Sequence, residues 1–186
     1  MRAALIVVDM LKDNIKGEHK VARAGRALIP RINKMISACR RKDVPIVFAC
    51  DSFLPQDFLF KSRMKPHCIR GTEGVRVVEE LDKAPEDLVL EKRRLSAFFK
   101  TDLDQTLRTL GIDTVAICGI TGPYCVLTTA LDAVSNDFFA VILKDCTASA
   151  NERTNEAIME IYENGPLHPL LRVMESSKFL EELDQG

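Results

Sequence analysis

The feature that most constrains the fold is the alternation of short apolar runs with stretches of helical periodicity. The runs are strand-length and rich in branched or apolar residues, and they cover residues 3–8, 45–50, 88–90, 114–118, 138–143 and, more weakly, 170–174. Apolar positions spaced three and four apart predict helices over residues 21–41, 74–81, 103–110, 125–136 and 151–162. This order is typical of a mainly parallel sheet with helices on both faces.

Length, charge and cysteine usage restrict the class of protein. The 186 residues fit a single domain, residues 1–186, which can bury a core without disulfides or structural metals. The six cysteines have no paired spacing, as expected of reduced thiols in the cytoplasm. With 26 Lys and Arg against 27 Asp and Glu, the chain lacks the excess of positive charge that is typical of proteins that bind nucleic acids. Residues 3–8 are too few to span a bilayer. We therefore expect a cytoplasmic protein that binds a small molecule, with no nucleic acid and no membrane as partner.

Polar side chains follow four of the expected strands at the point where each strand ends. Asp9 follows the first strand, Asp51 the second and Lys92 the third, and Cys125 comes shortly after the fourth. Ligands of open parallel sheets bind outside the carboxyl ends of the strands, so these side chains are expected at one crevice. Each also has a structural explanation: a turn or cap for Asp9, a surface charge for Lys92 and a core thiol for Cys125.

The types of side chain at this edge point to acyl chemistry. Cys125 begins a helical pattern after an apolar run that breaks at Gly119, and N–H groups and the helix dipole at such a corner lower a cysteine's pKa. Asp9 would take the thiol proton, and Lys92 would stabilise the anion. N–H groups of the corner would receive the oxyanion, and Asp9 would return the proton to a departing amine. The combination predicts amide hydrolysis.

The longest irregular stretch follows the second strand, over residues 51–71. It carries Phe53, Met64 and His67 together with further apolar side chains. Loops of this length often form lids or binding walls, although a solvated excursion is equally open.

Five segments share their pattern with a known superfamily. They are ALIVVDM at residues 4–10, HCIRGTEG at 67–74, KRRLSAF at 92–98, GITGPYCV at 119–126 and KDC at 144–146. With these segments the chain resembles the isochorismatase-like cysteine hydrolases, which include nicotinamidases and N-carbamoylsarcosine amidohydrolases. The resemblance implies a three-layer α/β/α fold, Rossmann-like, with about six strands, and a homo-oligomer.

The same resemblance implies roles for particular residues. Asp9, Lys92 and Cys125 would form a catalytic triad. The peptide bond between Ile120 and Thr121 would be cis, and the N–H groups of Thr121 and Cys125 would form the oxyanion hole.

One departure from the superfamily's pattern concerns a metal. Its nicotinamidases hold a metal through an Asp-x-His pair after the second strand and a later histidine. Here Asp51 and His67 match, but Phe53 stands in place of the first histidine. A three-ligand site has thus lost a ligand, and we expect no cofactor. Asp51 and His67 remain the candidate ligands if water or another loop residue completes a site.

A second departure concerns the substrate. Met64 stands where these enzymes usually have a tryptophan, Asn14 replaces a phenylalanine, and the chain has no Trp. Asn14, Phe53, Met64 and Tyr124 are the residues expected to contact the substrate. We expect a small amide or carbamoyl compound of the N-carbamoylsarcosine type, with nicotinamide as the alternative. A binding or scaffolding protein without catalysis is the remaining hypothesis.

Overall fold

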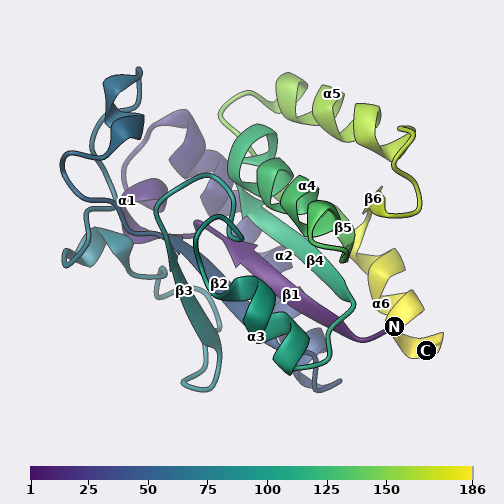
Figure 1. Ribbon diagram of the computed structural model, residues 1–186. Coiled ribbons are helices and arrows are strands. Elements are labelled where there is room, and N and C mark those ends of the chain that lie inside the picture. Colours follow the sequence, from purple (N-terminus) through teal and green to yellow (C-terminus); the bar gives the residue numbers. More distant parts are fainter. Residues whose placement is uncertain (186) are drawn as a thin grey trace.

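A parallel sheet forms the centre of the computed structural model, which describes residues 1–185 (Figure 1). Its strand order is β3-β2-β1-β4-β5-β6, and each neighbouring pair is parallel. The strands are β1 (Ala3–Val8), β2 (Ile46–Asp51), β3 (Leu88–Lys92), β4 (Thr114–Ile120), β5 (Phe139–Ala148) and β6 (Leu171–Met174). The predicted parallel α/β sheet of about six strands is confirmed for the residues described.

α-Helices connect the successive strands except β2 and β3, which are joined by a long loop with two 3-10 turns, and α6 follows β6. The helices are α1 (Lys12–Ile15), α2 (Lys20–Arg40), α3 (Leu103–Thr109), α4 (Leu127–Ser135), α5 (Glu152–Glu163) and α6 (Ser176–Gln185). Asn151 caps α5, because its side-chain oxygen accepts from the N–H of Thr154 at 3.2 Å. The single domain expected over residues 1–186 includes Gly186, which lies outside the described residues.

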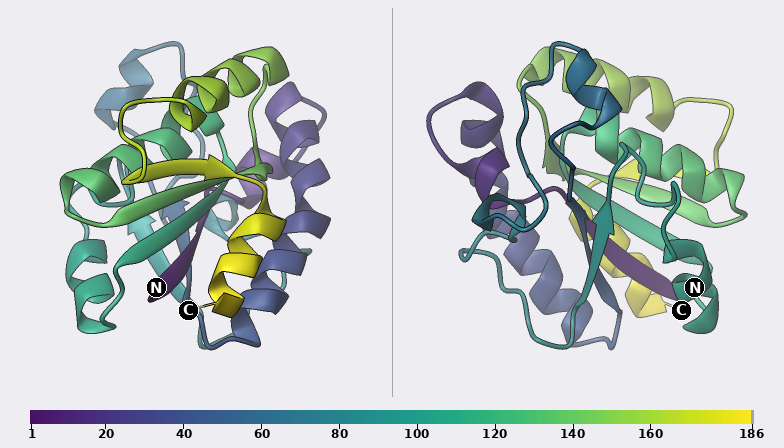
Figure 2. Two further views of the ribbon diagram at one scale, coloured as in Figure 1. Left: turned by 90° about the vertical axis from the view of Figure 1, so that its right-hand side faces the viewer. Right: turned by 60° about the vertical axis from the view of Figure 1, so that its left-hand side comes forward.

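The alternation of side chains along β1 builds a core on each face of the sheet. Leu5 and Val7 pack with α2 and α6, whereas Ile6 and Val8 pack with α3, α4 and α5. The two sets of helices lie on opposite faces of the sheet (Figures 1 and 2). The three-layer arrangement follows from strands that are buried on both faces.

The helix predicted over residues 74–81 is wrong. Only a three-residue 3-10 turn, Glu73–Val75, forms there, and the backbone that follows pairs with the segment after β1. The N–H of Val78 donates to the carbonyl of Met10 at 3.1 Å, and the N–H of Lys12 donates to that of Arg76 at 2.9 Å. The helix-like spacing arises because Val78 and Leu81 both point into the core.

Several boundaries differ from the prediction, and the long loop agrees with it. β3 continues to Lys92 and β4 to Ile120, two residues beyond the predicted ends. β5 continues to Ala148 rather than ending at residue 143. The helix expected from Cys125 begins at Leu127, because a π-helical turn, Gly122–Val126, precedes it. Residues 52–71 are largely irregular, with a short 3-10 helix at Phe58–Lys61.

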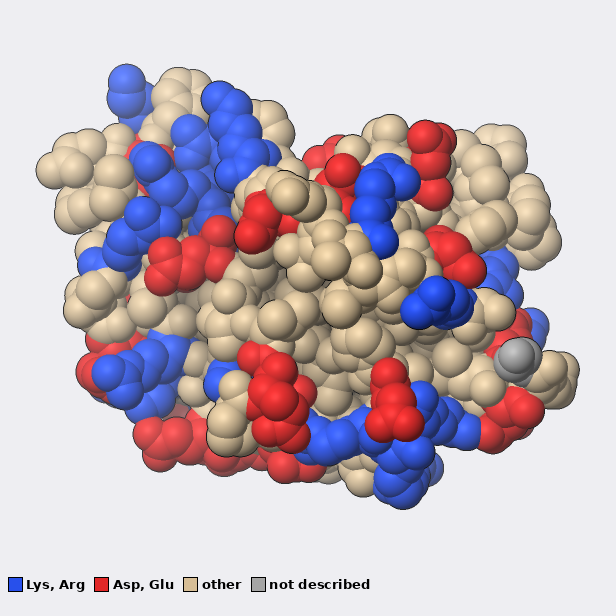
Figure 3. Space-filling view, turned by 60° about the horizontal axis from the view of Figure 1, so that its bottom comes forward, with Lys and Arg blue, Asp and Glu red and all other residues tan. Residues whose placement is uncertain are grey.

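Surface charge follows the near-neutral composition. Lys and Arg alternate with Asp and Glu along the lower edge of the face in Figure 3, and a group of Lys and Arg gathers at its upper left. Within residues 1–185, every helix is too short or too polar to cross a bilayer.

Candidate active site

Asp9 stands at the carboxyl end of β1, where the chain leaves the sheet. Its backbone is left-handed, with φ of 54°, a conformation that Asp adopts more readily than most residues. The residue is only 2% exposed, and its Oδ1 accepts a hydrogen bond from the backbone N–H of Asp51 at 2.9 Å. The neighbouring strand therefore fixes the direction of the Asp9 carboxylate.

Lys92 ends the edge strand β3 and is bound to two carboxylates. Its Nζ donates to Asp9 Oδ2 at 2.8 Å and to Asp51 Oδ1 at 2.5 Å, and also to the carbonyl of Arg94 at 3.3 Å. Asp51 and Lys92 are partners in the β2–β3 register. The strand order thus explains how a lysine 83 residues from Asp9 in sequence reaches it. Lys92 is 1% exposed, so this ammonium is a buried charge.

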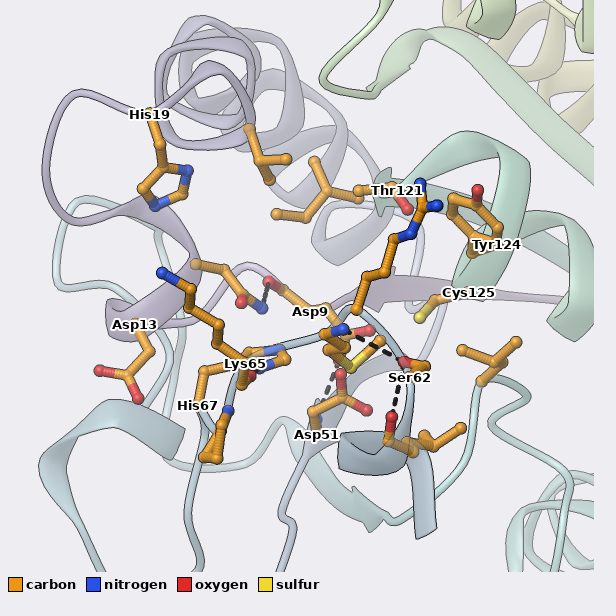
Figure 4. A pocket seen from close by; sticks show the side chains of 18 residues that line it. Asp9, Asp13, His19, Asp51, Ser62, Lys65, His67, Thr121, Tyr124 and Cys125 are labelled. Atoms are coloured by element: carbon orange, nitrogen blue, oxygen red, sulfur yellow. Dashed lines mark hydrogen bonds between the residues drawn. The ribbon is translucent and has the colours of Figure 1, made fainter. Parts of the chain in front are cut away.

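Cys125 approaches the carboxylates from the opposite side of the crevice, on the turn that precedes α4 (Figure 4). Its Sγ and carboxylate oxygens of Asp9 and Asp51 all lie within 4.8 Å of one another. Gly119 makes the approach of β4 to β1 possible: its φ is 110°, and a Cβ there would meet the backbone of Val8. The peptide bond between Ile120 and Thr121 is cis, as the resemblance implied.

Burial determines the electrostatics of these groups. Burial and the charge of Asp9 raise the pKa of the Cys125 thiol, although Lys92 opposes this shift. Burial and the charge of Asp9 also raise the pKa of Asp51 to about 7. Burial would lower the pKa of Lys92, but the attraction of Asp9, Cys125 and Asp51 outweighs it and the pKa is raised. The expectation of a lowered pKa for Cys125 is therefore wrong, because desolvation outweighs the corner's favourable dipoles.

A cavity of about 830 Å³ opens in front of the thiol. Of the residues expected to contact the substrate, Asn14, Met64 and Tyr124 line it, as does Thr121. Tyr124 is 61% exposed, and the Asn14 side chain donates from Nδ2 to the carbonyl of Asp9 at 3.0 Å. Asn14 thus supports the backbone of Asp9 while facing the cavity.

Phe53 is the expected substrate-contacting residue that does not line this cavity. Its ring is 1% exposed and packs edge-on against Phe60 and His67, with centroid distances of 5.2 and 5.6 Å. The side chain of Phe53 points into the core, so it packs beneath the loop and does not face the cavity. The prediction of direct contact is corrected on this point.

The residues present do not fit the three-ligand metal site considered for this position. Asp51 Oδ1 is bonded to Lys92, His67 Nδ1 donates to the carbonyl of Lys65 at 2.8 Å, and Phe53 offers no donor atom. Asp9, Asp51 and Cys125 are close enough to share an ion, but the ammonium of Lys92 already supplies a cation to both carboxylates. Zinc sites normally use three or four protein ligands, and at positions 51, 53 and 67 two side chains are bonded elsewhere and the third has no donor atom.

Several residues of the site were missed by sequence reasoning. Lys65, Arg63 and His19 line the cavity. The length of the loop over residues 51–71 and its basic residues were the signal for Arg63 and Lys65, whereas His19 lies at the N-cap of α2. Asp57 was also missed: its buried carboxylate accepts from Arg93 Nη2 at 2.8 Å and from Arg94 Nη1 at 3.1 Å. The two arginines thus tie the loop to the segment after β3.

Comparison with known proteins gives a consistent result. Residues 3–170 match the family model described as an isochorismatase domain. The structure of an isochorismatase-like hydrolase from Alkaliphilus metalliredigens is 30% identical, with a TM-score of 0.86, over 98% of this chain and 99% of that one. N-carbamoylsarcosine amidase from Thermoplasma acidophilum is also 30% identical, with a TM-score of 0.82, over 95% of this chain and 97% of that one.

A third relative is similar in sequence. It is a protein of Arabidopsis thaliana named as a probable inactive nicotinamidase, 28% identical over 90% of this chain and 92% of its own length.

Proposed function

The chain belongs to the isochorismatase family of hydrolases, and on that premise we propose that it is a cysteine-dependent amidohydrolase acting on small amides or ureido compounds. The observation that carries the proposal is the convergence of the Cys125 thiol, the Asp9 carboxylate and the Lys92 ammonium at one cavity. The leading substrate type is N-carbamoylsarcosine-like, and similarity to the Thermoplasma amidase supports it.

The first step of the proposed reaction is attack by sulfur. Because the pKa of the Cys125 thiol is raised, the thiol is protonated at rest and Asp9 takes its proton as the carbon–sulfur bond forms. The carbonyl oxygen becomes negative and accepts hydrogen bonds from the backbone N–H groups of Thr121 and Cys125. One oxyanion donor is worth about 3 kcal/mol of the barrier. Lys92 keeps Asp9 oriented and balances its charge.

The second step releases nitrogen and the third releases the acid. The tetrahedral adduct collapses, the carbon–nitrogen bond breaks, and protonated Asp9 gives its proton to the departing nitrogen. With an unsubstituted amide the product is ammonia, and the acyl group stays on Cys125 as a thioester; with a carbamoyl group the product is also ammonia, and the group on sulfur is the corresponding thiocarbamate. Water then gives a proton to Asp9 and attacks the thioester. Departure of the sulfur, which regains the proton, returns the enzyme to its starting state.

Two other hypotheses predict different results. Nicotinamide is the alternative substrate, but Met64 and Asn14 offer no aromatic ring to stack on a pyridine. A binding protein without catalysis is the hypothesis of another class, and the Arabidopsis relative named as probably inactive gives it a precedent by name. In that case the thiol and carboxylate would lie together without turnover.

The test is ammonia release by the purified protein from N-carbamoylsarcosine, other N-carbamoyl amino acids, nicotinamide and simple amides. Cys125→Ala should lower turnover at least about 10³-fold while changing the free energy of unfolding by less than about 2 kcal/mol. Cys39→Ala is the matched control, since Cys39 is buried in α2 and lines no part of this cavity. Turnover that survives in Cys125→Ala would refute the covalent mechanism.

A further inference from the structure

One wall of the cavity comes from the loop between β2 and β3. This segment, residues 62–67, is the loop wall of the cavity, and Figure 4 shows Ser62 and His67 from it beside the space that Cys125 faces. A substrate held at Cys125 would therefore lie against the loop wall. How firmly the wall is held determines how well the cavity is preformed for binding.

The loop is closed at its base by backbone hydrogen bonds. The N–H of Phe53 donates to the carbonyl of Cys68 at 2.9 Å, and the N–H of Arg70 donates to the carbonyl of Phe53 at 2.8 Å. Between these points, over residues 54–67, every hydrogen bond and ion pair to the rest of the described chain involves Asp57. Beyond the apolar packing of Phe53 beneath it, the loop thus depends on one polar tether.

The tether is an ion-pair cluster of Asp57 with Arg93 and Arg94, which we call the clasp. Asp57 Oδ1 accepts from Arg93 Nη2 at 2.8 Å and from Arg94 Nη1 at 3.1 Å. Asp57 Oδ2 accepts from Arg93 Nε at 3.1 Å and from the backbone N–H of Leu54 at 2.7 Å. Arg93 therefore binds both carboxylate oxygens in the strong bidentate geometry. Its hydrogen bonds lower the pKa of the Asp57 carboxyl, so the clasp stays charged at neutral pH.

The clasp joins the loop to the segment that carries the buried ammonium. Arg93 and Arg94 directly follow Lys92 at the end of β3, and Lys92 Nζ donates to the carbonyl of Arg94 at 3.3 Å. The clasp therefore holds the loop wall at a set distance from the strand end where Lys92 binds Asp9. A wall that is ordered before a ligand arrives lowers the cost of ordering it on binding.

We propose that Asp57 is a positioning residue, which acts through the clasp to hold the loop wall in its substrate-binding place. Asp57 does not line the cavity, so it acts through the wall and not by contact with the substrate. The kinetic part of the proposal rests on the proposed function, because it takes the substrate to bind between the wall and Cys125. Since proton transfer is assigned to Asp9, loss of the clasp should weaken binding more than it slows the chemical steps.

The chain offers a matched control in Asp87. Its Oδ2 also accepts the backbone N–H of the residue three positions earlier, Ala84, at 2.7 Å, and it accepts from Arg40 Nη2 at 2.9 Å. The Asp87 side chain is 5% exposed and that of Asp57 1%. Asp87 lies outside the cavity lining. Asn at either position removes a buried charge bound to an arginine, but only the change at Asp57 releases the loop wall.

Steady-state kinetics test the positioning role on the amide that the protein hydrolyses fastest. Asp57→Asn should raise KM at least about fivefold and lower kcat less than about threefold, whereas Asp87→Asn should change each less than about twofold. Arg93→Gln, at a half-exposed side chain, should also raise KM. Combined with Asp57→Asn it should add less than its separate effect, because both changes break the same contact. A fall in kcat at unchanged KM for Asp57→Asn, or an equal rise in KM for Asp87→Asn, would overturn the proposal.

Limited digestion with trypsin measures the clasp without any turnover. The loop carries exposed cleavage sites after Lys61 and Arg63, and cleavage requires the loop to open. Mass spectrometry of the fragments should show cutting there at least about fivefold faster in Asp57→Asn and less than about twofold faster in Asp87→Asn. If cutting is faster but no amide is hydrolysed, the proposed function fails and the clasp stands. Unchanged cutting would overturn the clasp even in an active amidase.

Discussion

Lys92 Nζ lies 2.5 Å from Asp51 Oδ1 while it also donates to Asp9. One buried ammonium therefore balances two buried carboxylates, only one of which is assigned to proton transfer. Asp51 draws the ammonium towards β2, and its backbone N–H holds the other oxygen of Asp9. The arrangement fixes Asp9 at both oxygens and leaves the cluster with more negative than positive groups.

Removing the shared cation should destabilise the fold. Lys92→Met keeps the length of the side chain but leaves Asp9 and Asp51 without a counter-ion, and breaking a buried pair in this way costs about 3–5 kcal/mol. Urea unfolding should show this loss, and turnover should disappear as well. Lys61→Met, at an exposed position, should change stability by less than about 0.5 kcal/mol. A loss below about 1 kcal/mol for Lys92→Met would mean that the carboxylates are not charged together.

The raised pKa of Asp51 predicts a characteristic pH dependence of stability. In the folded protein its pKa rises from the usual 3.8 to about 7, so between these values the folded state binds a proton that the unfolded state has lost. This group's contribution to stability is therefore greatest below pH 3.8 and falls as the pH rises towards 7, by at most about 1.4 kcal/mol per unit. Asp51→Asn should remove this component. Parallel pH profiles of unfolding free energy for the two proteins would contradict it.

The reactivity of Cys125 should depend on pH in a way that follows from its raised pKa. We expect iodoacetamide to modify Cys125 first in the native protein, because Cys125 lines the cavity of the candidate site. The thiols of Cys39 and Cys146, whose pKa values are also raised, do not line it. The rate should rise about tenfold per pH unit between pH 6 and 9 without levelling, since only the thiolate reacts. Mass spectrometry of peptides measures the rate of alkylation at each cysteine. A rate for Cys125 that levels off below pH 8 would indicate that the thiolate is present at rest.

Asp9→Asn should change the same alkylation and turnover in opposite directions. The charge of Asp9 raises the pKa of the Cys125 thiol, so its removal should speed alkylation at a given pH. Turnover should be lost, because the group that takes and returns the proton is absent. Slower alkylation together with lost turnover would suggest instead that the substitution distorts the site.

Sequence patterns were enough to predict the centre of the sheet because β1, β2 and β4 are buried on both faces and consist largely of apolar residues. Residues 3–8 and 114–118 became β1 and most of β4 for this reason. The segment around Val78 misled, because a helical spacing of apolar residues also arises in an irregular chain that returns twice to the core. Only the backbone hydrogen bonds from this segment to Met10 and Lys12, which are far away in sequence, distinguish such an irregular chain from a helix.

The convergence of Asp9, Lys92 and Cys125 could be predicted because the carboxyl ends of parallel strands share one edge. Their charge states could not, since the pKa of a thiol depends on how completely neighbouring segments bury it. The position of Phe53 was equally inaccessible: whether a residue after a strand faces a cavity or the core depends on the path of the following loop.

The turn that carries Cys125 is supported from behind by α5, and this leads to a prediction about Gly122. A Cβ at Gly122 would collide with Asn155 Oδ1 and lie 3.1 Å from Met159 Cε. Asn155 is held in turn by a bond from its Nδ2 to the carbonyl of Thr147 at 3.3 Å, while its Oδ1 has no hydrogen-bond partner in residues 1–185. Gly122→Ala should therefore destabilise the fold by about 1–3 kcal/mol, the usual cost of overpacking.

Because Gly122 stands three residues before the thiol, its displacement should also lower kcat more than it raises KM. Asn155→Ala removes the obstructing oxygen, so the double variant should recover part of both stability and kcat. Steady-state kinetics and urea unfolding of the two single variants and the double variant measure this coupling. Strict additivity of the two substitutions would show that Asn155 does not confine the nucleophile's turn, since a shared steric contact must produce an interaction energy between them.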